Sequence, residues 1–102
     1  MGIPEATFHI LIALASGERH GYAIIQEVEA ATDGKLRLGA GTLYRALQRM
    51  LEQGLILESN DRPPDDDERR RYYRITEEGR TAARAEAQRL AGMVRLAESR
   101  GI

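Results

Sequence analysis

The sequence predicts a mainly α-helical fold with one small β-hairpin, followed by a long C-terminal helix. Three observations support this prediction. Apolar residues recur at helical spacing in three segments before residue 54. Two short β-prone segments then flank a polar stretch that contains two prolines. An Ala/Arg/Glu-rich segment completes the chain, and Thr76 in front of it is a good N-cap.

The composition limits the class of protein. At 102 residues, with 42% hydrophobic residues, the chain can form one domain, or one domain with an appendage. The absence of cysteine excludes disulfides and thiolate metal sites and favours the cytoplasm. No apolar run approaches the roughly 20 residues that a membrane span needs. Because the net charge is only −1, contact with nucleic acid would have to come from local clusters of basic residues.

The first two helices are predicted over residues 5–15 and 22–32. Apolar residues of the first helix form one stripe and also lie beside it, so this helix should be buried on more than one side. The stripe consists of Phe8, Leu11, Ile12 and Ala15. The second helix stops at Asp33-Gly34, a C-terminal glycine signal. Residues 35–38 then alternate charge with leucine and predict a very short strand.

The third helix is predicted over residues 41–53, with Gly54 as its stop, and it has two different faces. The apolar face follows the spacing of a buried stripe. The opposite face carries side chains that can bond bases, since Arg pairs with guanine and Gln with adenine in two-point fashion. The candidate DNA-binding side chains of this face are Thr42, Arg45, Gln48 and Arg49. Gly41, at the start of the helix, lets the backbone approach the groove, and Tyr44 either packs at a helix junction or contacts phosphate through its hydroxyl. Ordinary solvated helices look similar, but from Lys35 to Gly54, with Arg37 included, there are four basic residues against one acid, which favours DNA.

The segment "DRPPDDDERRRYYRIT" at 61–76 reads as the tip and returning strand of the hairpin. Arg69, Arg70 and Arg71 are expected to meet phosphate, whereas the acidic block at 65–68 opposes contact with DNA or serves to dock a protein. Three helices followed by a hairpin is the element order of a winged helix-turn-helix. That fold offers its third helix to the DNA major groove and its hairpin to the flanking backbone.

The last helix carries an apolar seam that predicts a homodimer. Its residues are spaced 4, 3, 4, 3, as in a coiled coil, and Met93 flanks them. They are Ala83, Ala87, Leu90, Val94 and Ala97. The alternative is that this helix folds back on its own domain. We therefore divide the chain into a winged helix-turn-helix domain at 1–76 and a C-terminal dimerisation helix at 77–102.

Three motifs resemble the PadR family of bacterial transcriptional regulators. They are "HGYAII" at 20–25, "LGAGTLYRALQRMLEQGLI" at 38–56 and "RRYYRITEEGR" at 71–80. The resemblance implies a homodimeric DNA-binding protein of the short subgroup, usually a repressor, on a roughly palindromic site of double-stranded DNA. Many relatives have proline where this chain has Arg45. Some relatives bind aromatic or cationic compounds between their first and last helices, and here Phe8 and Met93 are the candidate liners for a small hydrophobic or aromatic effector.

A winged-helix module that binds protein without binding DNA is the main alternative, with the acidic hairpin tip as its docking surface. An enzyme is not expected, because His9 and His20 have no cysteine and no obvious serine partner. His9 is interpreted as structural, and His20 as a helix cap or a phosphate contact. Gly21, Gly54 and Gly79 are interpreted as positions where the backbone requires glycine. No metal and no cofactor are expected.

Overall fold

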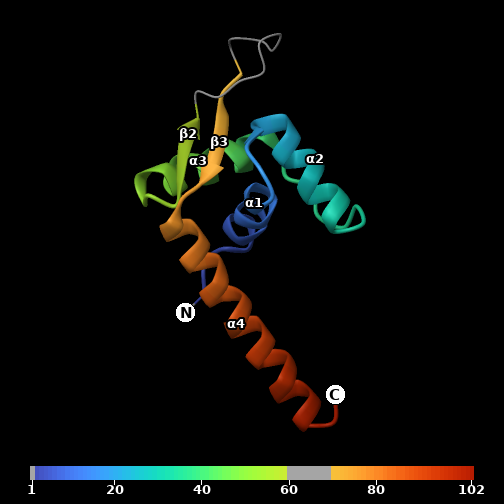
Figure 1. The fold of residues 1–102 in the computed structure, drawn as a ribbon. Coiled ribbons are helices and arrows are strands. Elements are labelled where there is room, and N and C mark those ends of the chain that lie inside the picture. Colours follow the sequence, from blue (N-terminus) through green and yellow to red (C-terminus); the bar gives the residue numbers. More distant parts are fainter. Residues whose placement is uncertain (1, 60–69) are drawn as a thin grey trace.

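The computed structural model describes residues 2–59 and 70–102 and contains four helices and three strands within them. In chain order these are α1 (Glu5–Ala15), β1 (Arg19–His20), α2 (Gly21–Ala31), α3 (Ala40–Glu52), β2 (Ile56–Ser59), β3 (Tyr72–Ile75) and α4 (Glu77–Ser99). The predicted mainly helical fold with a small hairpin is confirmed (Figure 1).

The strands form one antiparallel sheet in the order β1-β3-β2. The predicted hairpin is its larger part, with β2 and β3 in register from Ile56↔Ile75 to Ser59↔Tyr72. β1 adds two residues to the other edge of β3, through Arg19↔Tyr73 and His20↔Tyr72. The start of α2 is thereby joined to the end of β3 that lies next to the hairpin loop.

The strand predicted at residues 35–38 is wrong. The alternation in this segment does place Leu38 inside and leave Arg37 exposed. However, the segment pairs with no strand among the described residues, because the Leu36 N–H is satisfied by the Thr32 hydroxyl at 3.0 Å. It forms an irregular connection between α2 and α3.

α1 lies at the centre of the domain and contacts α2, α3, α4 and β3 (Figure 1). Burial on more than one side is confirmed, but the predicted stripe is only partly right. Ile10, Leu11 and Leu14 are buried, whereas Ile12 is 45% exposed and Ala15 is exposed. The neighbouring elements cover the face on which Ile10 and Leu14 lie, so the buried arc is rotated away from the apolar stripe.

The apolar face of α3 is buried as predicted, through Leu43, Ala46, Leu47 and Met50. Gly54 ends the helix at φ 75°, which favours glycine. The Leu55 N–H then bonds the Met50 carbonyl at 2.9 Å, and the Gly54 N–H bonds the Leu51 carbonyl at 3.2 Å, which is a Schellman motif. The chain thus turns directly from α3 into β2.

α4 begins at the base of the hairpin and runs away from the body of the domain (Figure 1). The predicted cap is confirmed, since the Thr76 hydroxyl accepts the Gly79 N–H at 3.0 Å. Ala82 and Ala83 pack against the core, but beyond Ala91 most residues are exposed. The molecule is therefore elongated, with extents of 53 × 28 × 22 Å. Within the described ranges, no helix is long and apolar enough to cross a membrane.

Candidate nucleic-acid interface

The outer face of α3 collects most of the predicted base-contacting residues. Gly41, Thr42, Tyr44, Arg45, Gln48 and Arg49 are all exposed. The buried apolar face holds this helix rigidly against the core, so the polar face points outward. At its start, Gly39 provides no side-chain cap, which leaves the first N–H groups of α3 accessible.

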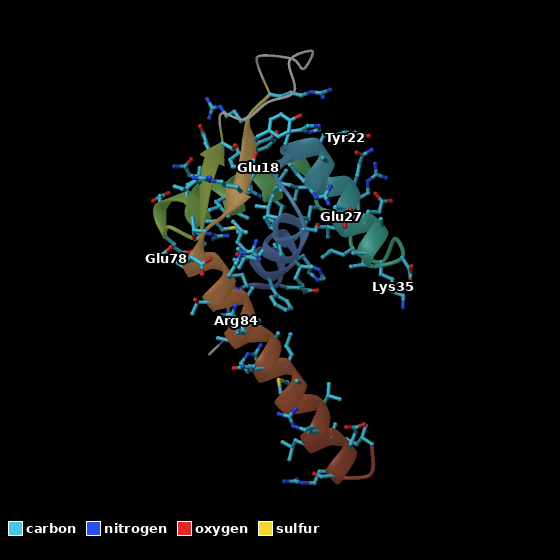
Figure 2. The ribbon with its side chains drawn as sticks, in the orientation of Figure 1. Glu18, Tyr22, Glu27, Lys35, Glu78 and Arg84 are labelled. Carbon is cyan, nitrogen blue, oxygen red and sulfur yellow. The ribbon has the colours of Figure 1, made fainter. Side chains whose placement is uncertain are left out.

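The two arginines of α3 differ from the other basic residues near it. Among residues 2–59 and 70–102, neither Arg45 nor Arg49 forms an ion pair or a side-chain hydrogen bond. By contrast, Arg37 lies 3.7 Å from Glu29. Lys35 is exposed at the opposite end of α2 from Tyr22, as Figure 2 shows. Lys35 and Arg37 thus lie beside α3 on the α2–α3 connection rather than on its outer face.

Of the three predicted wing arginines, the structure describes two. Arg70 and Arg71 are exposed just before β3. Nη1 of Arg71 lies 3.6 Å from Glu58 on β2, and Nη1 of Arg70 lies 3.5 Å from Nε2 of His20. Arg69 and the acidic block at 65–68 lie outside the described residues.

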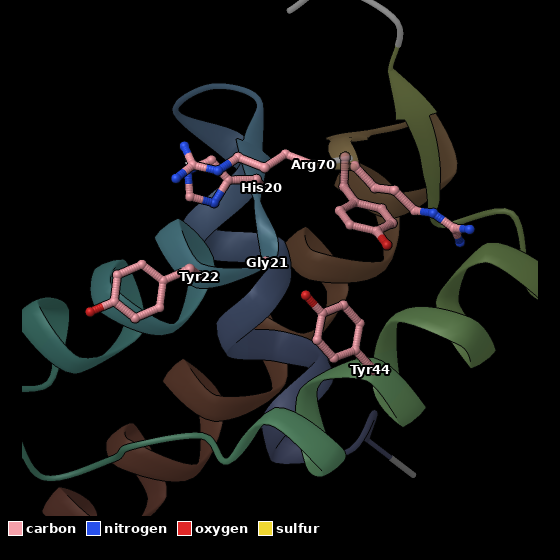
Figure 3. A pocket seen from close by; sticks show the side chains of 7 residues that line it. His20, Gly21, Tyr22, Tyr44 and Arg70 are labelled. Atoms are coloured by element: carbon pink, nitrogen blue, oxygen red, sulfur yellow. Dashed lines mark hydrogen bonds between the residues drawn. The ribbon is translucent and has the colours of Figure 1, made fainter. Parts of the chain in front are cut away.

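A pocket of about 340 Å³ lies where α2, α3 and β3 meet (Figure 3). It is lined by His20, Gly21, Tyr22, Tyr44, Arg70, Arg71 and Tyr73. In Figure 3 the Tyr44 hydroxyl points toward the start of α2, whereas the Tyr22 hydroxyl points away from it. The pocket therefore lies between the loop end of the hairpin and the two helices α2 and α3.

His20 and Gly21 shape this pocket. The His20 ring caps α2, because its Nδ1 accepts the Ala23 N–H at 3.2 Å. A Cβ at Gly21 would lie 2.5 Å from the Tyr44 hydroxyl. Gly21 does not have a positive φ, so its interpretation as a backbone requirement is wrong: the position needs a small side chain because Tyr44 packs over it.

Tyr73 was missing from the predicted site residues. It is 3% exposed and lies on the inner side of β3, where it lines the pocket. Burial raises the pKa of its hydroxyl, and the charge of Glu58 and the nearby Tyr44 raise it further, so the group stays protonated at neutral pH. The alternation of Tyr72 and Tyr73 indicated that one of them faces inward, but only the sheet register shows which one.

The predicted dimerisation residues fall into two groups along α4. Ala83 packs against the core of its own domain, and Leu90 is half-buried. Farther along, Met93 is 55% exposed and Val94 is 58% exposed. Ala87 is exposed and Ala97 is partly buried. The second half of α4 therefore presents apolar side chains that no described residue covers.

The candidate effector residues lie near a second cavity, of about 450 Å³, between α1 and α4. Phe8 lines it, together with Ile3, Glu5, His9, Glu86, Arg89 and Leu90. Met93 is not among the lining residues, although its sulfur accepts a hydrogen bond from Arg89 Nη1 at 3.3 Å. Glu86 is buried and takes two hydrogen bonds from Arg89, at 2.9 and 2.7 Å, which lower the pKa of its carboxyl below the ordinary value.

No group of three or more His, Cys, Asp or Glu side chains lies together within the part of the chain that the structure describes. His9 lies 3.8 Å from Glu5, and His20 caps α2. The two histidines are accounted for by these local contacts.

Comparisons with known proteins place this geometry in a family. Residues 10–85 match the Transcriptional regulator PadR-like family. A transcriptional regulator from Clostridium thermocellum superposes with a TM-score of 0.77 at 27% identity, covering 92% of this chain and 87% of the other. A PadR family transcription regulator from Clostridium difficile R20291 gives a TM-score of 0.79 at 24% identity, over 94% and 97%.

A curated relative is much longer than this chain. It is an uncharacterized 37.1 kDa protein in transposon TN4556 of Streptomyces fradiae, 37% identical over 87 residues. The match covers 85% of this chain but only 23% of that protein's length. With the family match over most of its length, the chain belongs to the PadR-like family of transcriptional regulators, which are DNA-binding regulators and not enzymes.

Proposed function

We propose that this chain is a homodimeric, sequence-specific DNA-binding repressor that acts in the bacterial cytoplasm. The observation that carries the proposal is α3, whose apolar face is buried while its outer face presents Arg45, Gln48 and Arg49 to solvent. Two arginines without an ion-pair partner among the described residues are suited to base edges, because guanidinium groups bond guanine through two atoms.

The wing supports the same orientation on DNA. Arg70 and Arg71 lie just before β3, at the loop end of the hairpin, where they would meet the backbone that flanks the major groove. Phosphate contacts of this kind set the position of the protein, while the contacts of α3 to bases set the sequence.

Dimerisation is supported by apolar side chains that a single copy leaves exposed. Met93, Val94 and Leu96 are each more than half exposed on α4. Ile12 on α1 is 45% exposed, although it belongs to the apolar stripe of that helix. A two-fold dimer through these surfaces would bury them and place two α3 helices about one DNA turn (~34 Å) apart, on a roughly palindromic operator.

A mobility-shift titration with the promoter of its own operon tests DNA binding. The wild-type protein should shift this DNA in a salt-sensitive way. Arg45→Ala plus Arg49→Ala should abolish the specific shift, whereas Arg84→Ala plus Arg100→Ala, which removes the same charge from α4 and its C-cap, should retain it. A wild-type protein that shows no salt-sensitive shift would overturn the proposal, as would a shift that survives the first double variant.

The protein-binding module is the second reading, in which the wing tip docks a protein. Its tip lies outside the described residues, and the exposed arginines of α3 favour DNA instead. The same titration distinguishes the DNA-binding repressor from the protein-binding module, because a protein-binding module would give no shift with any duplex.

Relief of repression by a small molecule is a further part of the proposal. The cavity between α1 and α4 is lined by Phe8 and adjoins the α4 surface proposed to dimerise, so a bound aromatic compound would alter the packing of α1 against α4. A panel of aromatic and cationic compounds scored by thermal shift should contain stabilising ligands, and Phe8→Ala should remove their effect. If no compound of either class raises the melting temperature, only this part of the proposal is refuted.

A further inference from the structure

The side chain of Arg19 joins three elements next to the hairpin. Arg19 lies in β1, and its backbone pairs with Tyr73 in β3. Its Nε donates to the Ala13 carbonyl near the end of α1 at 2.9 Å, and its Nη2 lies 3.8 Å from Glu27 on α2. Nη2 also donates to the Ser16 hydroxyl at 3.1 Å. Only 27% of the side chain is exposed, so Arg19 is held between α1, α2 and the sheet.

The C-terminal end of α1 requires donors from outside the helix. The last four carbonyl groups of a helix have no N–H partner within it, and the helix dipole favours a cation beside them. The last turn of α1 contains no basic residue. Arg19 supplies an N–H and a positive charge from β1, and Arg80 on α4 supplies a second donor, since its Nη2 bonds the Ala15 carbonyl at 3.4 Å. β1 is therefore attached to α1 through a side chain, in addition to its backbone pairing with β3.

β1 lies beside the loop end of the hairpin. The base of the hairpin is held by the core, because Ile56 is fully buried there. At the loop end, Ser59 pairs with Tyr72, and both residues are only half-buried. The Ser59 hydroxyl bonds Glu18 at 2.8 Å, so the segment around β1 contacts this end of the hairpin from two sides. A ladder of two residues is marginal by itself, so the position of the loop end depends on what fixes Arg19.

We propose that Arg19 is a positioning residue for DNA binding. It contacts no DNA itself. By fixing β1 to the end of α1 and to α2, it holds the loop end of the hairpin at a set place relative to α3. The side chain that benefits is Arg71, just before β3, whose contact with a phosphate rests on the proposed function. The hairpin and the reading helix then meet DNA as one rigid unit.

The test uses Arg19→Met, which keeps an unbranched apolar side chain and removes the donors and the charge. Fluorescence anisotropy with a duplex from the promoter of its own operon should show binding about tenfold weaker, as expected when one hydrogen bond to a charged group is lost. The slope of log K against log salt should become shallower by about 0.9, because one phosphate contact is lost. A role in stability alone would leave this slope of the folded protein unchanged.

A double-mutant cycle shows whether Arg19 acts through the hairpin. Arg71→Gln should weaken binding by the wild type about tenfold. In the Arg19→Met background it should have little further effect, because the contact is already lost. Arg45→Ala on α3 should weaken binding by the same factor in both backgrounds. Additive effects of Arg19→Met and Arg71→Gln would overturn the proposal.

Arg80→Met is the matched control. It removes the same charge and a donor at the same end of α1, but Arg80 lies on α4 and not in β1. The effect of Arg71→Gln should therefore be retained in Arg80→Met. If it is lost there as completely as in Arg19→Met, the stability of α1 is responsible and the proposal fails. Should Arg19→Met fail to fold, Arg19→Lys runs the same cycle, since one amine cannot replace both Nε and Nη2, and the same additivity would overturn the proposal.

Hydrogen exchange in the free protein provides an arm that does not depend on DNA. Arg19→Met should speed exchange of the β1 amides that bond β3. The Thr76 amide, which bonds the Leu55 carbonyl at 3.1 Å at the base of the hairpin, should keep its rate. Unchanged exchange in β1 would refute the attachment by Arg19. If the wild type binds no duplex but β1 responds, the repressor proposal fails while the attachment stands; if it binds and the cycle is additive, only the role of Arg19 fails.

Discussion

Replacing Gly79 by alanine should destabilise the fold, although alanine is the better helix former. Gly79 is buried in the first turn of α4. A Cβ there would overlap the Leu55 carbonyl oxygen and would lie 2.9 Å from Cγ1 of Ile75 and 3.2 Å from Cδ2 of Leu11. The Leu55 carbonyl cannot withdraw freely, because it accepts the Thr76 N–H at 3.1 Å.

The size of the effect follows from two opposing contributions. At an unobstructed helical site, Gly→Ala stabilises by up to about 1 kcal/mol. Forcing a carbon into a filled site destabilises by about 1–3 kcal/mol, and weakening the hydrogen bond to Leu55 removes about 1 kcal/mol more. We therefore expect Gly79→Ala to lower the free energy of unfolding by about 2 kcal/mol, and the melting temperature by roughly 10 °C for a domain of this size.

Gly92→Ala on the same helix is the matched control. The nearest atom to a Cβ at Gly92 is Nη2 of Arg95, at 3.8 Å, which is an ordinary contact. This variant should gain about 0.5–1 kcal/mol. Both are measured by urea and thermal unfolding followed by circular dichroism, at several protein concentrations so that association is separated from folding. If Gly79→Ala is as stable as Gly92→Ala, the close packing at Leu55 does not constrain the fold and the reasoning is refuted.

Three further predictions concern α4. Thr76→Ala should destabilise by about 1–2 kcal/mol through loss of the N-cap, whereas Thr81→Ala on the exposed surface should change stability little; chemical unfolding compares them. Because hydrogen bonds from Arg89 lower the pKa of Glu86 below 4.5, its stabilisation is fully present above that pH and is lost as the pH falls through the lowered pKa. The difference in urea midpoint between wild type and Glu86→Gln should therefore shrink from pH 6 to pH 3, and a constant difference would contradict this. Val94→Glu should shift sedimentation equilibrium toward monomer while the far-UV spectrum is retained, and an unchanged mass would count against α4 as the dimer surface.

The helical part of the fold could be predicted because its pattern is local. The two faces of α3 follow from apolar spacing within 13 residues, and the Thr76 cap follows from one residue in front of an Ala-rich segment. Neither needs knowledge of a distant neighbour.

The remaining features depend on contacts between distant segments. β1 has only two residues, too few to show alternation, and it exists because β3 offers an edge to Arg19 and His20. The residues at 35–38 alternate correctly but have no strand beside them among the described residues. Gly79 has an ordinary helical φ, and only the position of Leu55 explains why it is glycine. The pocket likewise combines residues 20, 44 and 73, which no local motif connects.

The junction at the start of α4 is the pivot about which a small rotation of this long helix would be amplified toward its far end. The Thr76 hydroxyl donates to the Gly54 carbonyl at 2.7 Å and accepts from Gly79, so the end of α3, the hairpin and α4 are fastened at one point. α4 has 23 residues and is about 34 Å long. A rotation of about 10° at the pivot would move its far end by about 6 Å, nearly two base-pair steps of DNA. In a dimer joined along α4, the half-site spacing that the two reading helices can match would then be set by the packing of a few atoms around Gly79.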